Sequence, residues 1–415
     1  MFIRRKINAS GSISIQIIHK LNGKNKIIKV IGSSKIIEEI ALLHEAGLEE
    51  IKLLLGTVEL SFEESKEQQF IDQFTQGIQK LSLVGPELLL GKIFDEIGFN
   101  IIEDDLFRHL VITRLVYPVS KLRTVDYLIK YKAVKLSVYS VYRYLDKLQK
   151  HQIEQVKNIS LTHTLKLFGN VMNIVFYDVT TLYFEAKDED DFKRMGFSKD
   201  GKHQQPQIVL GLLVSQNGYP LDYDLFEGNK YEGDTLIPVV EHFVAKHKPE
   251  QLVVVADAGL LSKANIKALV EKKYQYILGA RIKNETKTII AQILSLKLID
   301  KQSVMLDNED GSKLIISYKK ARAIHDLQIR PIYHQLQRRI EAHICIAFAA
   351  CKIYKELERQ LKEKQIGKSP EQVIDILKTI LKVEFKTPFS NKTYHELIIN
   401  TEEQKLIVSN FNLKI

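Results

Sequence analysis

Two aspartates in this sequence each follow a run of four apolar residues. Asp178 comes after residues 174–177 in the stretch NIVFYDVTTLYFE, and Asp257 comes after residues 253–256 in QLVVVADAGLL. Runs of this kind are typical of strands that are buried on both faces. An aspartate that ends such a strand is either a turn-former or a carboxylate held rigidly for chemistry. Because the pattern occurs twice, we favour the second interpretation.

Two carboxylates on neighbouring strands have a specific chemical use. They can share a pair of Mg²⁺ ions, which prefer oxygen ligands. Two such ions activate an attacking oxygen and stabilise a leaving oxygen in phosphodiester chemistry. A phosphatase with an aspartyl nucleophile would need a second acid two residues after the first, where this chain has Thr180. We therefore predict a metal site at Asp178 and Asp257, with two unrelated turn aspartates as the alternative.

The segments around the two aspartates predict a mixed sheet with helices on its faces. Three strand-like runs come first, and helices then alternate with strands, which is the order expected for an α/β domain. The predicted strands are residues 173–185, 206–221, 221–229, 251–261 and 274–282, and the predicted helices are residues 234–247 and 262–273. Further along, apolar residues at helical spacing predict one long buried helix from Pro331 to about Lys364.

The N-terminal part of the chain has a different pattern. Isoleucines alternate with polar residues on both sides of Asn22 and Gly23, which predicts a β-hairpin. Helical spacing follows from Ser34 to about Gly56, and helix-like segments continue from Glu67 to about Lys166. We expect three domains, with boundaries at residues 1–60, 61–168 and 169–415.

Two short helices near the middle of the chain suggest how the protein contacts a partner. They are joined by the sequence KAVKL, and each begins near a serine that is suited to N-capping. In a helix-turn-helix motif, Tyr139, Ser140 and Arg143 would lie near the start of the second helix, where side chains reach DNA base edges. The alternative is an ordinary helical hairpin whose tyrosines pack inward.

Composition narrows the class of protein. A length of 415 residues exceeds what one core usually supports, and 60 basic against 51 acidic residues give a net charge of +9. This charge favours a polyanionic partner. With only Cys345 and Cys351, the chain has no disulfide framework or multi-cysteine zinc site. No run reaches the ~20 apolar residues of a membrane span, so we expect a soluble cytoplasmic protein without a signal peptide.

Four stretches, taken in order, resemble bacterial insertion-sequence transposases of the DDE class. They are YDVTTLYFE, GFSKDGKHQQPQIVLGLLVSQNGYPLDYDLFEGNKYEGDTL, VVVADAGLLS and IRPIYHQLQRRIEAHICIAFAA. The resemblance implies an α/β fold with a ribonuclease H-like mixed sheet flanked by helices, preceded here by the hairpin and a mostly helical, DNA-end-binding domain. By the same resemblance, Asp178 and Asp257 are the first and second catalytic carboxylates and bind the metal.

The resemblance also implies an activity and its partners. Transposases of this class bind double-stranded DNA at the terminal inverted repeats of their element. They hydrolyse a DNA strand at each end and join the freed 3′ hydroxyl to target DNA, using Mg²⁺, for which Mn²⁺ can substitute. We accordingly expect a bacterial cytoplasmic protein that is nucleoid-associated when bound, that has no membrane partner, and that can form a homodimer on DNA.

The third catalytic carboxylate of the family is missing from its expected place. In the family it is a glutamate on a helix a few turns before the positions of Arg330 and Pro331, but residues 313–329 contain no glutamate. We interpret this as an internal deletion that shortened an insertion at about residues 284–325. Catalysis by this copy is therefore in doubt, because two carboxylates do not readily hold a second metal ion.

Two other acids are weak candidates for the third position. Asp326 is too near Arg330 in sequence, and Glu341 lies beyond Pro331, where we expect it to pair with Arg338 or another basic residue. One alternative to an active transposase is a non-catalytic DNA-binding remnant. Another is a host nuclease, against which only the family resemblance argues.

Some further residues are candidates for DNA contact. They are His203, Arg330, His334, Arg338 and Arg339, each of which has an ordinary solvated role as its alternative. Residues 227–229 match a family turn after the third core strand, where we expect Gly228 to supply an unusual backbone angle.

Overall fold

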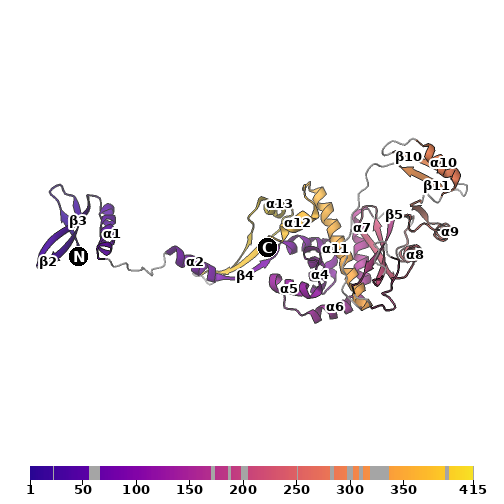
Figure 1. Cartoon of the computed structure of the whole chain (residues 1–415), viewed down its shortest axis with the longest axis horizontal. Helices are drawn as coiled ribbons and strands as arrows, with labels where there is room; N and C mark the ends of the chain where they lie inside the picture. Colours follow the sequence, from indigo (N-terminus) through magenta and orange to yellow (C-terminus); the bar gives the residue numbers. More distant parts are fainter. Residues whose placement is uncertain are drawn as a thin grey trace. The chain divides into compact units, whose positions relative to one another are not determined.

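The fold is given by a computed structural model of the chain (Figure 1). It describes residues 1–21, 23–55, 66–169, 173–185, 188–197, 204–249, 251–280, 285–296, 302–307, 312–317, 336–387 and 392–414. These residues form two compact units, Met1–Gly77 and Ile78–Ile415, which we call unit 1 and unit 2. Among the described helices, none combines the length and the apolar character that crossing a membrane requires.

Unit 1 is a three-stranded antiparallel sheet with a helix packed on one face. Its elements are β1 (Phe2–Ile7), β2 (Ile13–Leu21), β3 (Lys24–Ser34), α1 (Ile37–Leu54) and α2 (Lys66–Gly77), and the strand order is β1-β2-β3. Gly23, at the β2–β3 turn, has a φ of +78°, a conformation that favours glycine. The expected hairpin and helix are confirmed, whereas strand β1 was not anticipated.

The first part of unit 2 is helical. It contains η1 (Glu87–Gly91), α3 (Lys92–Ile97), η2 (Phe99–Ile101), α4 (Asp105–Val116), α5 (Lys121–Lys132), α6 (Val138–His151) and α7 (Ile153–Leu167). Ser120 and Ser137 cap α5 and α6, because their side chains accept hydrogen bonds from the backbone N–H groups of Arg123 and Ser140. The two predicted helix starts are confirmed.

A five-stranded mixed sheet forms the centre of unit 2. Its strands are β5 (Ile174–Tyr183), β6 (Gln207–Ser215), β7 (Pro220–Glu227), β8 (Val253–Ala256) and β9 (Gln275–Leu278). The order is β7-β6-β5-β8-β9, with antiparallel pairing among β7, β6 and β5 and parallel pairing among β5, β8 and β9. This is the ribonuclease H-like arrangement that was expected.

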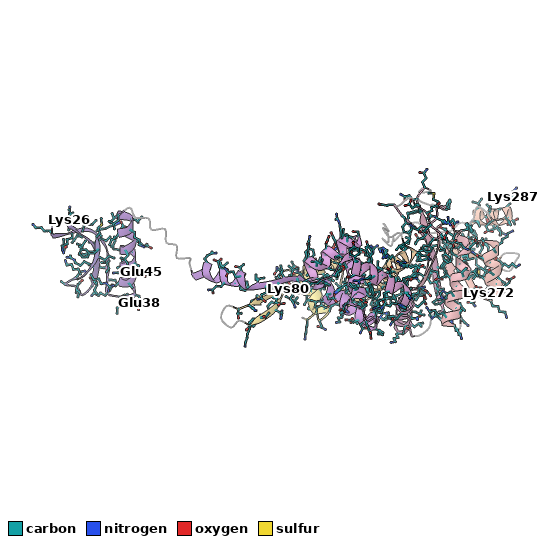
Figure 2. The ribbon with its side chains drawn as sticks, turned by 90° about the horizontal axis from the view of Figure 1, so that it is seen from below. Lys26, Glu38, Glu45, Lys80, Lys272 and Lys287 are labelled. Carbon is teal, nitrogen blue, oxygen red and sulfur yellow. The ribbon has the colours of Figure 1, made fainter. Side chains whose placement is uncertain are left out.

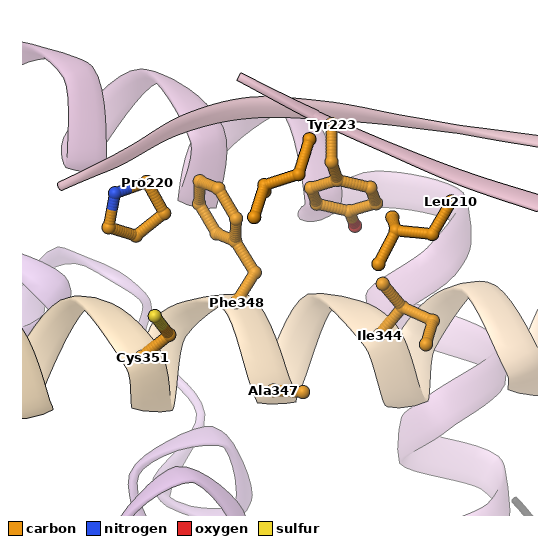
Figure 3. Close-up of a pocket in the computed structure, with 8 residues that line it drawn as sticks. Leu210, Pro220, Tyr223, Ile344, Ala347, Phe348 and Cys351 are labelled. Carbon is orange, nitrogen blue, oxygen red and sulfur yellow. The ribbon is translucent and has the colours of Figure 1, made fainter. Parts of the chain in front are cut away.

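Helices cover both faces of this sheet. On one face, α8 (Leu236–His247) contributes to a buried apolar cluster with β5, β6 and β8. On the other face, α11 (Gln337–Glu363) packs against β6 and β7, where Ile344 and Phe348 point at Leu210 and Tyr223 (Figure 3). The same cluster includes side chains of α4 and α6. The helical part and the sheet therefore share one core.

The remaining elements lie toward the C-terminus. They are α9 (Lys263–Glu271), α10 (Lys287–Ser295), β10 (Ser303–Asp307), β11 (Lys313–Ser317), α12 (Pro370–Leu377), β12 (Leu381–Lys386), β13 (Thr393–Ile398) and α13 (Glu402–Asn410). Besides the expected C-terminal helices, strands β12 and β13 form a second sheet with β4 (Ile78–Leu83), in the order β13-β12-β4. This sheet was not anticipated, because β4 is about 300 residues away from β12 in the sequence.

Candidate catalytic site

The pairing of β5 with β8 brings the two aspartates together. The strands run parallel, and Tyr177 lies opposite Ala256, the last residue of β8. The residues that follow this pair in the sequence are Asp178 and Asp257, and both are exposed. Neighbouring strands lie about 4.8 Å apart, so the two carboxylates flank the same small region of the sheet surface.

The two aspartates differ in their local backbone. Asp257 follows the last residue of β8, as expected, but Asp178 does not end its strand. Strand β5 continues to Tyr183, and Asp178 pairs with Leu212 of β6. Only the ladder to β8 stops beside Asp178, since β8 ends at Ala256. Asp178 is therefore held inside a continuous strand, beside the point where the ladder to β8 ends and Asp257 follows.

Alternation along β5 decides which way Asp178 faces. Val175, Tyr177 and Val179 are buried in the cluster that contains α8. Asp178 lies on the opposite face, which it shares with Leu212, its partner in register. Leu212 lines the contact with α11, so Asp178 is on the α11 side of the sheet.

The loop after Asp257 is held by hydrogen bonds. The Oδ1 atom of Asp257 accepts from the backbone N–H of Gly259 at 2.9 Å. Asn265, on α9, donates through Nδ2 to the carbonyl oxygens of Leu260 at 2.8 Å and Gly233 at 2.7 Å. This buried amide joins the Asp257 loop to the turn η3 (Glu232–Asp234). Sequence reasoning missed Asn265, since an asparagine in a first helical turn carries no signal of its burial.

Turn η3 places a further carboxylate near Asp257. A Cβ atom at Gly259 would lie 3.1 Å from Oδ1 of Asp257 and 3.6 Å from Oε2 of Glu232. Two hydrogen bonds connect this turn to β5. The Tyr177 hydroxyl donates to Oγ1 of Thr235 at 2.8 Å, and the Thr235 hydroxyl donates to the backbone carbonyl of Glu232 at 2.6 Å. Burial raises the pKa of Tyr177, so its hydroxyl stays protonated and keeps donating.

Glu341, a candidate third carboxylate, is engaged elsewhere. Its Oε2 accepts from Nε2 of Gln149 on α6 at 2.8 Å, and its Oε1 accepts from Nε2 of Gln337 at 2.8 Å. The ion pair with Arg338 that was expected for Glu341 is not formed, and in the described part of the chain these two amides are the hydrogen-bond partners of its carboxylate. The basic side chains beside it have another acidic partner.

That partner is Asp146 on α6. Its Oδ1 accepts from Nε of Arg338 at 2.8 Å and from Nε of Arg339 at 3.1 Å. The hydrogen bond from Arg339 is the largest cause that lowers the pKa of Asp146. Arg339 also lies over the Tyr142 ring, 4.7 Å from its centroid. Both arginines therefore join α11 to α6.

The residues proposed for base contact lie at the start of α6. Tyr139 is 75% exposed and Arg143 is also exposed, whereas Tyr144 is buried and donates to Gln152 at 3.0 Å. The side chain of Ser140 is half-buried, and its Oγ lies 3.0 Å from that of Ser137. Of these tyrosines of α6, Tyr139 is exposed to solvent and Tyr144 is buried in the core.

The structure does not describe some of the candidates. His203, Asp326, Arg330 and His334 lie outside the described residues. Within the described part of the chain, no group of three or more His, Cys, Asp or Glu residues is arranged to hold a metal ion. Asp178 and Asp257 nonetheless suit a hard divalent cation, because they are adjacent, exposed and have oxygen donors.

Gly228, after β7, is required for a reason other than the one expected. Its φ is not in the left-handed region, so the expectation of an unusual backbone angle is wrong. A Cβ atom there would lie 2.0 Å from the carbonyl oxygen of Gln207 and 2.2 Å from that of Arg194. Glycine is needed because three backbone segments meet at this point.

Comparison with known proteins assigns the family. Residues 169–379, just over half of the chain, match the transposase DDE domain. The chain belongs to this family. The match contains Asp178, Asp257 and all five strands of the central sheet, so the candidate site of this transposase lies inside the family domain. Unit 1 lies outside it.

Solved structures give a more distant likeness. A piggyBac transposase synaptic complex with hairpin DNA is 11% identical, covers 71% of this chain and 79% of its own, and has a TM-score of 0.37. A Mos1 transposase paired-end complex with the left transposon end is 12% identical, with coverages of 41% and 57% and a TM-score of 0.19. At these values neither adds to the family assignment. No curated protein sequence matches this transposase.

Proposed function

We propose that this protein is the DNA transposase of a bacterial insertion sequence. In this proposal it binds the terminal inverted repeats of its element, cleaves a DNA strand at each end and joins that end to target DNA. The observation that carries the proposal is the adjacency of Asp178 and Asp257 on parallel strands within a transposase DDE domain. Substrate DNA, a homodimer on that DNA and a cytoplasmic location belong to the same proposal.

Asp178 and Asp257 would hold the Mg²⁺ that the chemistry requires, and Mn²⁺ can replace it. When bound, the metal activates an attacking oxygen and stabilises the leaving oxygen of the phosphodiester. The residues of the chain fix the positions of the two carboxylates. Strand β5 continues on both sides of Asp178 and so fixes its backbone, and the N–H of Gly259 orients the side chain of Asp257. Because both side chains are exposed, a DNA strand can approach them.

A second candidate function is a DNA-binding remnant that no longer cleaves. Two observations favour it. In the described ranges, no third acid joins Asp178 and Asp257 in a metal-binding group. In addition, both oxygens of Glu341 accept hydrogen bonds from amides. The remnant would bind element ends and compete with intact copies. The two candidates differ only in metal-dependent cleavage.

The test uses labelled duplexes that carry the DNA ends flanking the gene. Binding and strand cleavage are followed together in Mg²⁺ and in Mn²⁺ for the wild-type protein and for Asp178→Asn and Asp257→Asn. A matched control is Asp375→Asn, which makes the same change at an exposed position of α12. If the protein is active, the two site variants lose cleavage by a factor on the order of 10⁴, while the control behaves as wild type.

The outcomes separate the candidates. Metal-dependent cleavage that only the site variants lose supports the active transposase and rejects the remnant. Selective binding of the ends without cleavage in either metal supports the remnant. A wild-type protein that neither binds nor cleaves these ends contradicts both.

A further inference from the structure

Charge is distributed unevenly within unit 1. Residues 1–37, which include the whole sheet, contain no Asp or Glu but contain Arg4, Arg5, Lys6, Lys20, Lys24, Lys26, Lys29 and Lys35. Helix α1 carries Glu38, Glu39, Glu45, Glu49 and Glu50. In Figure 2, Lys26, near the β2–β3 turn, lies away from Glu38 and Glu45 on α1. Unit 1 thus has a basic sheet and an acidic helix.

The helix covers one face of the sheet only. A Cβ atom at Gly47 of α1 would lie 3.0 Å from Ile3, 3.4 Å from Ile15 and 3.5 Å from Ile31, so these side chains face the helix. Residues that alternate with them along a strand face away. We call that second side of the sheet the open face.

Strand register assigns side chains to the open face. Arg4 pairs with Gln16 and Lys6 pairs with Ser14, and these four residues alternate with Ile3 and Ile15. Arg4 donates through Nη2 to Oε1 of Gln16 at 2.7 Å, which confirms that the two share a side. Lys20 follows in the same alternation along β2. Lys6 and Lys20 are exposed, and the buried Gln16 orients Arg4.

Apolar side chains accompany these cations. Phe2 and Ile27 both pair with Ile18, and Val30 pairs with Gln16, which places all three on the open face. They are 44%, 47% and 53% exposed, respectively. A surface that combines cations with exposed apolar groups suits duplex DNA, because cations neutralise phosphates and apolar groups contact thymine methyls.

We propose that the open face of unit 1 is a binding surface for double-stranded DNA, with Arg4, Lys6 and Lys20 contacting phosphates. The geometry is appropriate, since β-ribbons and sheets enter DNA grooves. Charge complementarity favours a polyanion such as DNA as the partner, because residues 1–37 contain no acidic residue that would neutralise these cations. The inference rests on the proposed function and adds a DNA contact outside the DDE domain and outside α6.

The test compares two double variants of the full-length protein. Lys6→Gln with Lys20→Gln removes two cations from the open face. Lys26→Gln with Lys29→Gln is the matched control, since it removes the same charge from unit 1 at positions off that face. Lys29 is bound to Glu50 of α1 at 2.6 Å, and Lys26 pairs with His19, which alternates with the open-face residue Ile18. All four side chains are exposed. Thermal melts of each variant serve to check that it folds.

Affinity for the labelled element ends is measured by fluorescence anisotropy at several salt concentrations. We expect the open-face variant to bind on the order of ten- to sixty-fold more weakly at ~0.1 M salt, with a salt slope reduced by about two. The control should stay near wild type in both quantities.

Two results would overturn the inference while leaving the proposed function intact. One is an open-face variant that binds as wild type does, and the other is equal weakening of both variants, which would indicate only general charge. A wild-type protein that binds no duplex at all would overturn the proposed function together with the inference.

Discussion

At the scale of single residues, the site is determined by the backbone pairing and by the hydrogen bonds and packing of a few side chains. Asp178 and Asp257 are adjacent because the β5–β8 ladder stops one residue before both of them. Their surroundings are fixed by side chains that do no chemistry, of which Asn265 is the clearest case. Gly228 shows the same principle for a residue with no side chain, since it allows β6, β7 and the segment at Arg194 to meet.

The Gly228→Ala variant tests this close approach. The added Cβ atom would lie within 2.2 Å of two backbone oxygens, which cannot rotate away, so we expect the free energy of unfolding to fall by about 3 kcal/mol. Urea denaturation of the full chain measures the change. Gly367→Ala is the control, because nothing lies within 4 Å of its Cβ position. Equal stability of the two variants would contradict the packing argument.

At the scale of elements, α11 joins the two parts of unit 2. Ile344 and Phe348 pack on the sheet, while Arg338 and Arg339 bind Asp146 of α6. Its middle also buries a lysine, Lys352, which is 0% exposed. That side chain donates to Oγ1 of Thr164 on α7 and lies 4.3 Å from the centroid of the Tyr219 ring.

Burial of Lys352 predicts a pH dependence of stability. Desolvation lowers its pKa from 10.5 to about 7, although Glu356 acts in the opposite direction. Between these values the unfolded chain binds a proton that the folded chain does not, so this lysine makes stability rise with pH from about 7 to 10.5. Relative to Lys352→Met, the wild type should gain up to ~1.4 kcal/mol per pH unit across this window.

Urea denaturation at pH 7, 8 and 9 measures that gain. Lys355→Met, one turn away on the same helix, is the control, since Lys355 is partly exposed and bonded to Glu358 at 3.0 Å. Stability profiles of wild type and Lys352→Met that run parallel over this range would show that the lysine remains charged in the folded protein.

At the scale of the whole molecule, segments from the N-terminal and C-terminal ends of unit 2 pack against each other. Strand β12 pairs with β4 about 300 residues earlier, and Nζ of Lys92 donates to the Phe411 carbonyl at 2.9 Å. Ile407, Phe411 and Leu413 belong to the same buried cluster as α4 and α11. The C-terminal segment is therefore part of the core that supports the sheet.

The Phe411→Ala variant tests this role of the C-terminal segment. Phe411 is 2% exposed, and its truncation should leave a cavity that destabilises unit 2 by about 3–5 kcal/mol. Leu406→Ala is the control, because Leu406 lies on α13 but is exposed. The expected readout is an earlier unfolding transition for Phe411→Ala alone. Similar transitions for both variants would show that the segment adds little to the core.

The sequence by itself determined the elements whose signals are local. Apolar runs located β5 and β8, serines located the starts of α5 and α6, and the isoleucine pattern located the N-terminal hairpin. Together with the family motifs, these signals were sufficient to assign the ribonuclease H-like fold and to select Asp178 and Asp257.

Only the tertiary structure decided what depends on contacts between distant segments. Asp178 lies inside its strand because β6 continues to pair beyond it, and Glu341 binds Gln149 because α11 packs on α6. The β4–β12 pairing, the burial of Asn265 and the open face of unit 1 arise in the same way. The periodicity of apolar residues in the sequence indicates which side of an element is buried, but it does not indicate which other element covers that side.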